Sequence, residues 1–202
     1  MATSKTQATD DADRNQLIIP LAALKAVRQF SAKQDVRFYL LGLQIEIKDN
    51  MVSMVATNGH TLAYWQDNTV VEDTTIYLPN EMADLLIKHS PRSGVVFTKD
   101  DLGNWSTSVG DGYAAIGFTV AIRKPEFAYP AWRRVLDPDA PEVTADVIFD
   151  VGYMNLMMKV GKILGEKQPR LIIRGEKRTA QFRFDCMTIE GTFKALVMPM
   201  SI

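Results

Sequence analysis

Three stretches of the chain share one pattern of apolar and polar positions. Each opens with a short apolar run of the kind found in strands and continues into apolar positions three and four residues apart, the spacing of one helix face. The stretches are residues 17–32, 76–90 and 148–164. Superposing Pro20, Pro79 and Val151 aligns the stretches and predicts three strand–helix units. The residues three and seven positions further on then form the apolar helix face: Ala23 and Val27 in the first unit, Met82 and Leu86 in the second, and Met154 and Met158 in the third.

Apolar and polar residues alternate after each predicted helix, as Leu43, Ile45 and Ile47 do against Gln44 and Glu46. Such alternation is typical of antiparallel strands with one buried face. The predicted strands are residues 36–47, 51–56, 61–65, 94–98, 105–109, 113–122, 170–174, 180–185 and 188–198. The fold class is therefore predicted to be α+β, with three strand–helix–strands repeats.

The repeats divide the chain into a predicted tail and two parts. Residues 1–16 show no periodicity and are predicted to be a disordered tail. Residues 17–137 hold two repeats, 17–72 and 74–137, and residues 143–202 hold the third. The segment 137–142 contains two prolines and acidic residues, so it is the expected linker.

Composition narrows the class of protein. The 202 residues are 47% hydrophobic and 23% charged, which is typical of a globular protein. We expect no membrane span, because no apolar run approaches about 20 residues. We expect no secretory signal, because residues 1–16 hold no apolar run. The single cysteine, Cys186, excludes an intramolecular disulfide. The expected location is the cytoplasm.

Charge is distributed unevenly between the predicted helical segments and the rest. Segments 17–33, 80–92 and 153–170 hold nine basic and three acidic residues, a net charge of +6, so the remainder carries −7 of the total of −1. One interpretation is a solvated helix face with snorkelling lysines. The other is a row of helices that presents positive charge to a phosphate backbone.

Four strings of residues resemble a known family when they are taken in order. They are residues 34–42 (QDVRFYLLG), 55–63 (VATNGHTLA), 129–136 (YPAWRRVL) and 196–202 (LVMPMSI). Together they are similar to the bacterial replicative DNA sliding clamp, the β subunit of DNA polymerase III. The resemblance covers essentially all of residues 17–202.

The resemblance implies a DNA-clamp fold, with helices inside a ring and antiparallel sheets outside. It implies a non-enzymatic processivity factor in DNA replication that encircles duplex DNA and tethers a DNA polymerase or other DNA enzyme. The alternative is a clamp-like adaptor or decoy that binds clamp-binding peptides without encircling DNA. A third hypothesis, a small hydrolase that uses His60, has little support, because no nucleophile motif accompanies this histidine.

The chain departs from the family in length. The family has three domains, hence six repeats, whereas this chain has three and resembles one full clamp domain and half of another. A ring of twelve repeats then needs four chains. We expect a homo-oligomer, with a tetramer favoured in which third repeats pair across chains. A clamp loader is a further expected partner, unless the ring assembles by itself.

The resemblance and the charge pattern together predict a DNA-binding set from two helices and one loop. Lysine and arginine on the helices would contact phosphates, and the loop pairs a basic residue with aromatic side chains. The alternative for Phe38 and Tyr39 is that they begin a strand and alternate into its core. The set is Lys25, Arg28, Gln34, Arg37, Phe38, Tyr39, Lys159 and Lys162.

The resemblance also predicts a hydrophobic cleft for an extended partner peptide. Adaptable methionines suit varied ligands, and Gly59 would allow close backbone approach. The alternative is that the Met-Pro-Met terminus only closes the core. Thr61 and Ser201 stand where the family has arginine. The set is Leu40, Thr57, Gly59, His60, Leu62, Pro79, Met82, Leu196, Val197, Met198, Pro199 and Met200.

No cofactor or metal is expected. The sequence has no P-loop, GxGxxG, HExxH or GxSxG motif. Asp100 and Asp101 form a pair at a predicted turn without a third carboxylate at ligand spacing.

Overall fold

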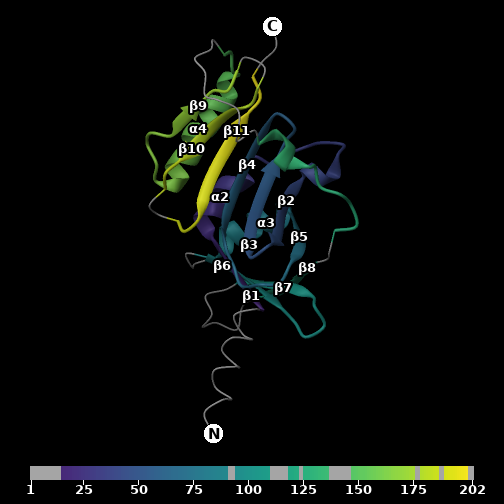
Figure 1. The fold of residues 1–202 in the computed structure, drawn as a ribbon. Helices are drawn as coiled ribbons and strands as arrows, with labels where there is room; N and C mark the ends of the chain where they lie inside the picture. The colour runs from purple at the N-terminus through teal and green to yellow at the C-terminus, as the bar shows by residue number, and fades with distance from the viewer. Residues whose placement is uncertain are drawn as a thin grey trace.

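The computed structural model describes residues 15–90, 94–109, 118–122, 125–136, 147–175, 178–186 and 189–199 (Figure 1). The predicted linker 137–142 and nearly all of the predicted tail lie outside these residues. The tail's last residue, Gln16, already belongs to the first strand.

The described elements repeat in three units. The first unit holds β1 (Gln16–Pro20), α2 (Leu21–Arg28), the 3₁₀ helix η1 (Phe38–Leu40), β2 (Gly42–Lys48), β3 (Met51–Thr57) and β4 (Thr61–Asn68). The second holds β5 (Thr74–Pro79), α3 (Asn80–His89), β6 (Gly94–Lys99), β7 (Trp105–Val109), β8 (Phe118–Ile122) and the 3₁₀ helix η2 (Trp132–Val135). The third holds α4 (Val151–Leu164), β9 (Arg170–Ile172), β10 (Ala180–Phe184) and β11 (Thr192–Val197).

Two antiparallel sheets connect the units. One has the strand order β1-β6-β7-β8 and the other β5-β2-β3-β4-β11-β10-β9. The strand before each of the first two helices crosses to the other unit, because β1 pairs with β6 and β5 pairs with β2. The third unit joins the first through six residue pairs between β4 and β11. The predicted α+β class is confirmed.

Each helix begins directly after a residue in extended conformation. Pro20 and Pro79 stand immediately before α2 and α3, where a proline costs no helical hydrogen bond. Asp150 precedes α4, and its carboxylate accepts a hydrogen bond from the Gly152 N–H at 2.6 Å. None of the described helices combines the length and apolar character needed to cross a membrane.

The third helix is one residue out of the register that the sequence pattern predicted. Its N-cap Asp150, not Val151, is equivalent to Pro20 and Pro79. Met157 is consequently 3% exposed in the core, whereas Met158 is 63% exposed. The prediction for Met158 is wrong, because two adjacent methionines fit the helical spacing almost equally well.

The segment before β2 is a compact turn and not the predicted strand. Phe38, Tyr39 and Leu40 form η1, and the Ala32 N–H donates to the Leu40 carbonyl at 2.9 Å. The Asp35 carboxylate accepts hydrogen bonds from the Arg37 backbone N–H and from its guanidinium. The alternative in which Phe38 and Tyr39 alternate into a strand core is therefore wrong, because this local bonding competes with extension.

The longer sheet is buried on both faces near its centre. On one face, α2, α3 and α4 cover it, with α2 in contact with both other helices. On the other face, Val55, Leu62, Tyr64 and Leu196 pack against Trp132, which belongs to a segment that leaves the second unit. This explains why β4 reads as a continuous apolar run at its start.

The β4–β11 junction depends on close backbone approach. The Trp65 indole Nε1–H donates to the Glu190 carbonyl at 2.7 Å. Gly191 has a φ of 86°, and a Cβ there would lie 2.3 Å from the Gln66 carbonyl oxygen. Only glycine satisfies both the left-handed backbone and this contact.

We predict that Gly191→Ala destabilises the protein far more than Gly103→Ala. Both glycines have left-handed φ values, 86° and 83°, so each alanine costs about 1–2 kcal/mol. A Cβ at Gly103 meets only the Lys99 Cε, at 3.9 Å, whereas one at Gly191 clashes with main chain and adds about 1–3 kcal/mol. Urea unfolding midpoints measure both variants, and equal losses would contradict the packing described for the junction.

Candidate functional site

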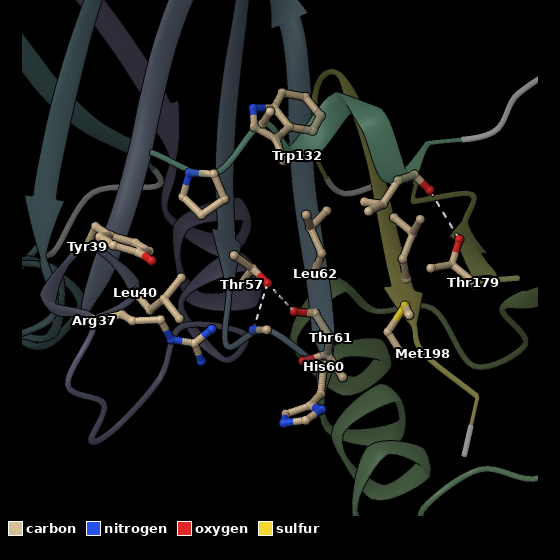
Figure 2. A pocket seen from close by; sticks show the side chains of 15 residues that line it. Arg37, Tyr39, Leu40, Thr57, His60, Thr61, Leu62, Trp132, Thr179 and Met198 are labelled. Atoms are coloured by element: carbon tan, nitrogen blue, oxygen red, sulfur yellow. Dashed lines mark hydrogen bonds between the residues drawn. The ribbon is translucent and has the colours of Figure 1, made fainter. Parts of the chain in front are cut away.

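A hollow of about 310 Å³ lies where η1, the β3–β4 turn, β11 and the segment around η2 meet (Figure 2). Its walls come from segments far apart in the sequence, and most of the lining side chains are apolar. The lining residues are Arg37, Tyr39, Leu40, Thr57, Gly59, His60, Thr61, Leu62, Pro130, Ala131, Trp132, Val135, Thr179, Leu196 and Met198. We call this hollow the cleft.

The floor of the cleft is a tightly bonded turn between β3 and β4. The Thr57 hydroxyl donates to the Thr61 carbonyl at 2.7 Å and accepts from the Gly59 N–H at 3.1 Å. The Asn58 side-chain oxygen accepts from the backbone N–H groups of His60 and Thr61. Gly59 has a φ of 91°, so the turn requires a residue tolerant of that conformation. The floor is thus held in place before any ligand arrives.

The C-terminal strand is attached to this floor. The Met198 N–H donates to the His60 carbonyl at 3.0 Å, which extends the β4–β11 pairing to the rim of the cleft. Met198 is 42% exposed, whereas Leu196 beneath it is buried. The rim therefore offers an adaptable apolar side chain above a fixed base.

Trp132 forms a rigid wall of the cleft. Its ring centroid lies 5.2 Å from that of Tyr64, and the Arg133 guanidinium lies over the Trp132 ring, 4.3 Å from its centroid. Arg133 also forms an ion pair with Glu46. The Thr179 hydroxyl donates to the Val135 carbonyl at 3.1 Å, which connects this wall to the third unit.

The structure brings together seven of the predicted cleft residues and separates the others. Leu40, Thr57, Gly59, His60, Leu62, Leu196 and Met198 line the cleft. Val197 points to the opposite face and is fully buried in the core. Pro79 and Met82 line a different hollow, beside Tyr77 and Phe127. Pro199 is described but does not line the cleft, and Met200 lies outside the described residues.

Sequence reasoning missed the wall opposite the predicted cleft residues. Pro130, Ala131, Trp132 and Val135 lie within the string 129–136, which the resemblance had singled out without assigning it to the cleft. Thr179 carried no sequence signal. Arg37 and Tyr39, predicted for DNA contact, also line the cleft.

The helical members of the predicted DNA-binding set differ in exposure and in whether an acidic residue pairs with them. Arg28 donates to the Asp84 carboxylate at 2.7 Å and to the Ser31 hydroxyl at 2.8 Å, so α3 partly neutralises it. Lys159 and Lys162 are exposed on α4, and Lys25 is half-buried on α2. None of these three lysines forms an ion pair with a residue that the structure describes. Within this set of four, the two lysines on α4 are thus the most exposed charges without a described ion pair.

The loop members of that set lie close together around η1. Gln34 is exposed, and Phe38 is 58% exposed with its ring 5.1 Å from Phe127 and 5.9 Å from Tyr39. Arg37 is held against Asp35 by two guanidinium hydrogen bonds of 2.8 and 2.9 Å. The loop therefore presents aromatic surface beside a paired arginine.

Burial and pairing shift the pKa of two tyrosines and of Asp35. Burial raises the pKa of the Tyr129 phenol and raises that of Tyr77 to about 12, so both are neutral at ordinary pH. The side-chain and backbone hydrogen bonds from Arg37 lower the pKa of Asp35 to about 2. The Asp35–Arg37 pair is thus fully ionised near neutrality.

One histidine, His60, is among the residues that line the cleft. His60 is exposed at the cleft rim, and no described cluster of three or more His, Cys, Asp or Glu side chains could hold a metal ion. The chemistry on offer is apolar contact, backbone hydrogen bonding and positive charge.

Comparisons with known proteins identify the fold. No family model and no curated protein matches the sequence. A DNA polymerase sliding clamp from Pseudomonas aeruginosa, solved with a ligand, is similar in structure at a TM-score of 0.71 and 16% identity, covering 94% of this chain and 67% of that one. The H. pylori β clamp in complex with diflunisal is similar at a TM-score of 0.72 and 11% identity, covering 94% of this chain and 67% of that one. The DNA polymerase III β subunit of Thermotoga maritima is similar at a TM-score of 0.65 and 13% identity, covering 93% of this chain and 66% of that one.

The predicted resemblance and clamp fold are confirmed. The chain has the fold of the bacterial DNA polymerase III β sliding clamps and spans about two thirds of the length of those chains. At these identities the likeness establishes the fold, and function has to be argued from the site.

We predict that the Asp35 carboxyl titrates near pH 2 and that Arg37→Gln returns its pKa toward the ordinary value of 3.8. The pair stabilises the fold above that ordinary value, and its contribution is lost as the pH falls toward 2, because the folded pKa is the lower one. Carboxyl ¹³C NMR across an acid titration measures this. Arg133→Gln, which removes the partner of Glu46, is the control and leaves Asp35 unchanged.

Proposed function

We propose that this protein is a DNA sliding clamp, a non-enzymatic processivity factor that encircles duplex DNA and tethers a DNA polymerase or other DNA enzyme. The observation that carries the proposal is the continuous β4–β11 sheet with three helices on one face, in the fold of bacterial sliding clamps. Contacts to phosphate need no base recognition, so such a ring can move along any sequence.

The ring requires more than one copy of this chain. Three units per chain and twelve repeats per ring give four chains, so a homotetramer is the proposed assembly. Closed symmetry completes such a ring with few distinct interfaces. A clamp loader is a proposed partner in opening it.

The proposed DNA-facing surface is the layer formed by α2, α3 and α4, here called the helix layer. Lys25, Lys159 and Lys162 supply charge without described ion pairs, and the η1 loop adds Gln34 and Phe38 at one end. A ring of such surfaces attracts the duplex weakly at many points, which permits sliding.

The cleft is the proposed tethering site. Its bonded floor, the Trp132 wall and the Met198 rim suit apolar anchors on an extended peptide. Holding a polymerase at the template raises its effective concentration there without any new catalytic group.

The second candidate is a clamp-like adaptor or decoy that uses the cleft without encircling DNA. The observation in its favour is that Arg28 and Arg37, two of the predicted DNA contacts, are already paired with Asp84 and Asp35. Such a protein would bind peptides and ignore DNA, so the two candidates differ in a single assay.

We predict retention of the protein on nicked circular DNA, with loss from the same DNA after linearisation, because a ring slides off free ends. Gel filtration at moderate salt measures the retained protein, with a clamp loader and ATP supplied where assembly needs them. Equal loss from both templates would favour the adaptor.

The matched variants for this assay exchange one positive charge each. Lys159→Glu on α4 reduces DNA retention severalfold through lost phosphate attraction. Lys48→Glu, at an exposed residue at the end of β2 and outside the three helices, leaves retention close to wild type. Equal effects of the two variants would show that position does not matter, contrary to the proposed DNA face.

We also predict that Met198→Glu weakens binding of an extended peptide with Leu and Phe anchors about tenfold, which corresponds to about 1.4 kcal/mol. The carboxylate would be desolvated against the apolar rim of the cleft. Fluorescence anisotropy with the labelled peptide measures the affinity, and the same peptide with Ser at both anchors is the ligand control. Leu102→Glu, at a residue 87% exposed on the β6–β7 turn, is the protein control.

A further inference from the structure

The outermost strand of the third unit, β9, has a pairing partner on one side. On one side β9 pairs with β10, and Leu171 lies opposite Phe182. Among the residues that the structure describes, no strand pairs with its other side. Because cross-strand partners share a face, Leu171 points to the core side with Phe182, yet it is 41% exposed. An inward apolar residue at an open edge marks a place where a strand is missing.

The first two units show what belongs at such an edge. In each, the first strand after the helix pairs with the strand that precedes the other unit's helix. The residue before the helix lies opposite the first strand residue, as Pro20 does with Gly94 and Pro79 with Gly42. The residue one earlier is inward and buried, as Ile19 is opposite Val95.

The third unit has the donor segment as well as the open edge. Residues 147–150, here the lead-in segment, precede α4 in the position of β1 and β5 and are assigned to no strand. Exposure alternates along them, with Val147 and Phe149 half-buried and Ile148 50% exposed. By contrast, the equivalent Leu17, Ile19, Ile76 and Leu78 are at most 3% exposed.

We propose that two copies of this chain exchange lead-in segments, so that residues 147–150 of each copy form an antiparallel strand on the β9 edge of the other. The two junctions are related by a two-fold axis and are identical, as a closed isologous interface requires. The exchange completes, between copies, the pairing that β1–β6 and β5–β2 make within one.

The register taken from the first two units gives compatible chemistry at each position. The partner's Asp150 lies opposite Arg170, which places opposite charges together. The partner's Phe149 lies opposite Leu171, both facing the core, and the partner's Ile148 lies opposite Ile172 on the outer face. No polar side chain is forced against an apolar one in this register.

A hollow beside α4 provides room for the incoming apolar side chains. It has a volume of about 510 Å³ and is lined by α4, by the segment that connects α4 to β9, and by Phe182 of β10. Its lining includes Met154, Met157, the exposed Met158 and Phe182. The partner's Phe149 would enter next to Phe182, and flexible methionines can close around it.

The exchange would form one of the interfaces in the proposed ring, and in that respect it builds on the proposed function. The observations behind it are the strand pairings within this chain, which do not involve DNA. A pair of chains joined in this way is half of a twelve-repeat ring. The second interface of such a ring is a separate matter.

The register is tested by disulfide formation between copies. In a Cys186→Ser background, Ile148→Cys with Ile172→Cys should give a covalent dimer on a non-reducing gel under mild oxidation, because directly opposed residues have Cβ atoms about 4.5–5.5 Å apart. Ile148→Cys with Leu171→Cys is the control, since those side chains face opposite sides of the sheet. Absence of the covalent dimer in the first variant, or equal dimer in both, would overturn the proposal.

The non-covalent interface is tested by light scattering. Leu171→Asp should halve the mass measured for the wild-type chain at the same concentration, whereas Leu102→Asp should leave it unchanged. Circular dichroism verifies that the Leu171→Asp variant is folded. If that variant does not fold, the cross-linking experiment tests the exchange instead. A monomeric wild type, or a mass unaffected by Leu171→Asp, would overturn the exchange.

The outcomes separate this inference from the proposed function. Cross-linking at residues 148 and 172 without retention on circular DNA would leave the exchange standing and remove the clamp. Retention on circular DNA without cross-linking would leave the clamp standing and require a ring closed through other surfaces.

Discussion

Backbone pairing between β4 and β11 joins parts of the chain that are far apart in sequence. The hydrogen bond from the Trp65 indole to the Glu190 carbonyl, which spans 125 positions, supports the same junction. This pairing converts the sheets of the first and third units into one seven-stranded sheet. It also brings α4 against α2 and places Met198 over His60. Without it the cleft would lose its C-terminal rim and the helix layer would lose its most freely charged member.

The same junction determines how much of the sheet's other face is covered. The segment around η2 covers Tyr64 and Leu196, and Thr179 of the third unit bonds to its Val135 carbonyl. The cleft is the uncovered remainder between this segment and the β3–β4 turn. Its shape is thus a consequence of how the second unit's tail crosses the junction.

Much of the fold could be predicted from the chain, because local periodicity reports local structure. The three helices, the hairpin at Asp49 and Asn50, and the repeat of strand–helix–strands all follow from short-range patterns. The 3₁₀ turn at Phe38 was missed, since hydrogen bonds from Arg37 to Asp35 override an apolar run that reads as a strand. The register of α4 was missed by one residue, since adjacent methionines are interchangeable in such a pattern.

The sequence by itself indicated the three units, the basic bias of α4 and seven of the fifteen residues that line the cleft. These features depend on residues near one another or on strings that resemble a family. Only the tertiary structure decided which of them meet. It separated Pro79 and Met82 from the cleft, added Trp132 and Thr179, and tied Arg28 to Asp84. Those outcomes depend on which strands pair across long distances, and a linear pattern of polarity carries no record of that choice.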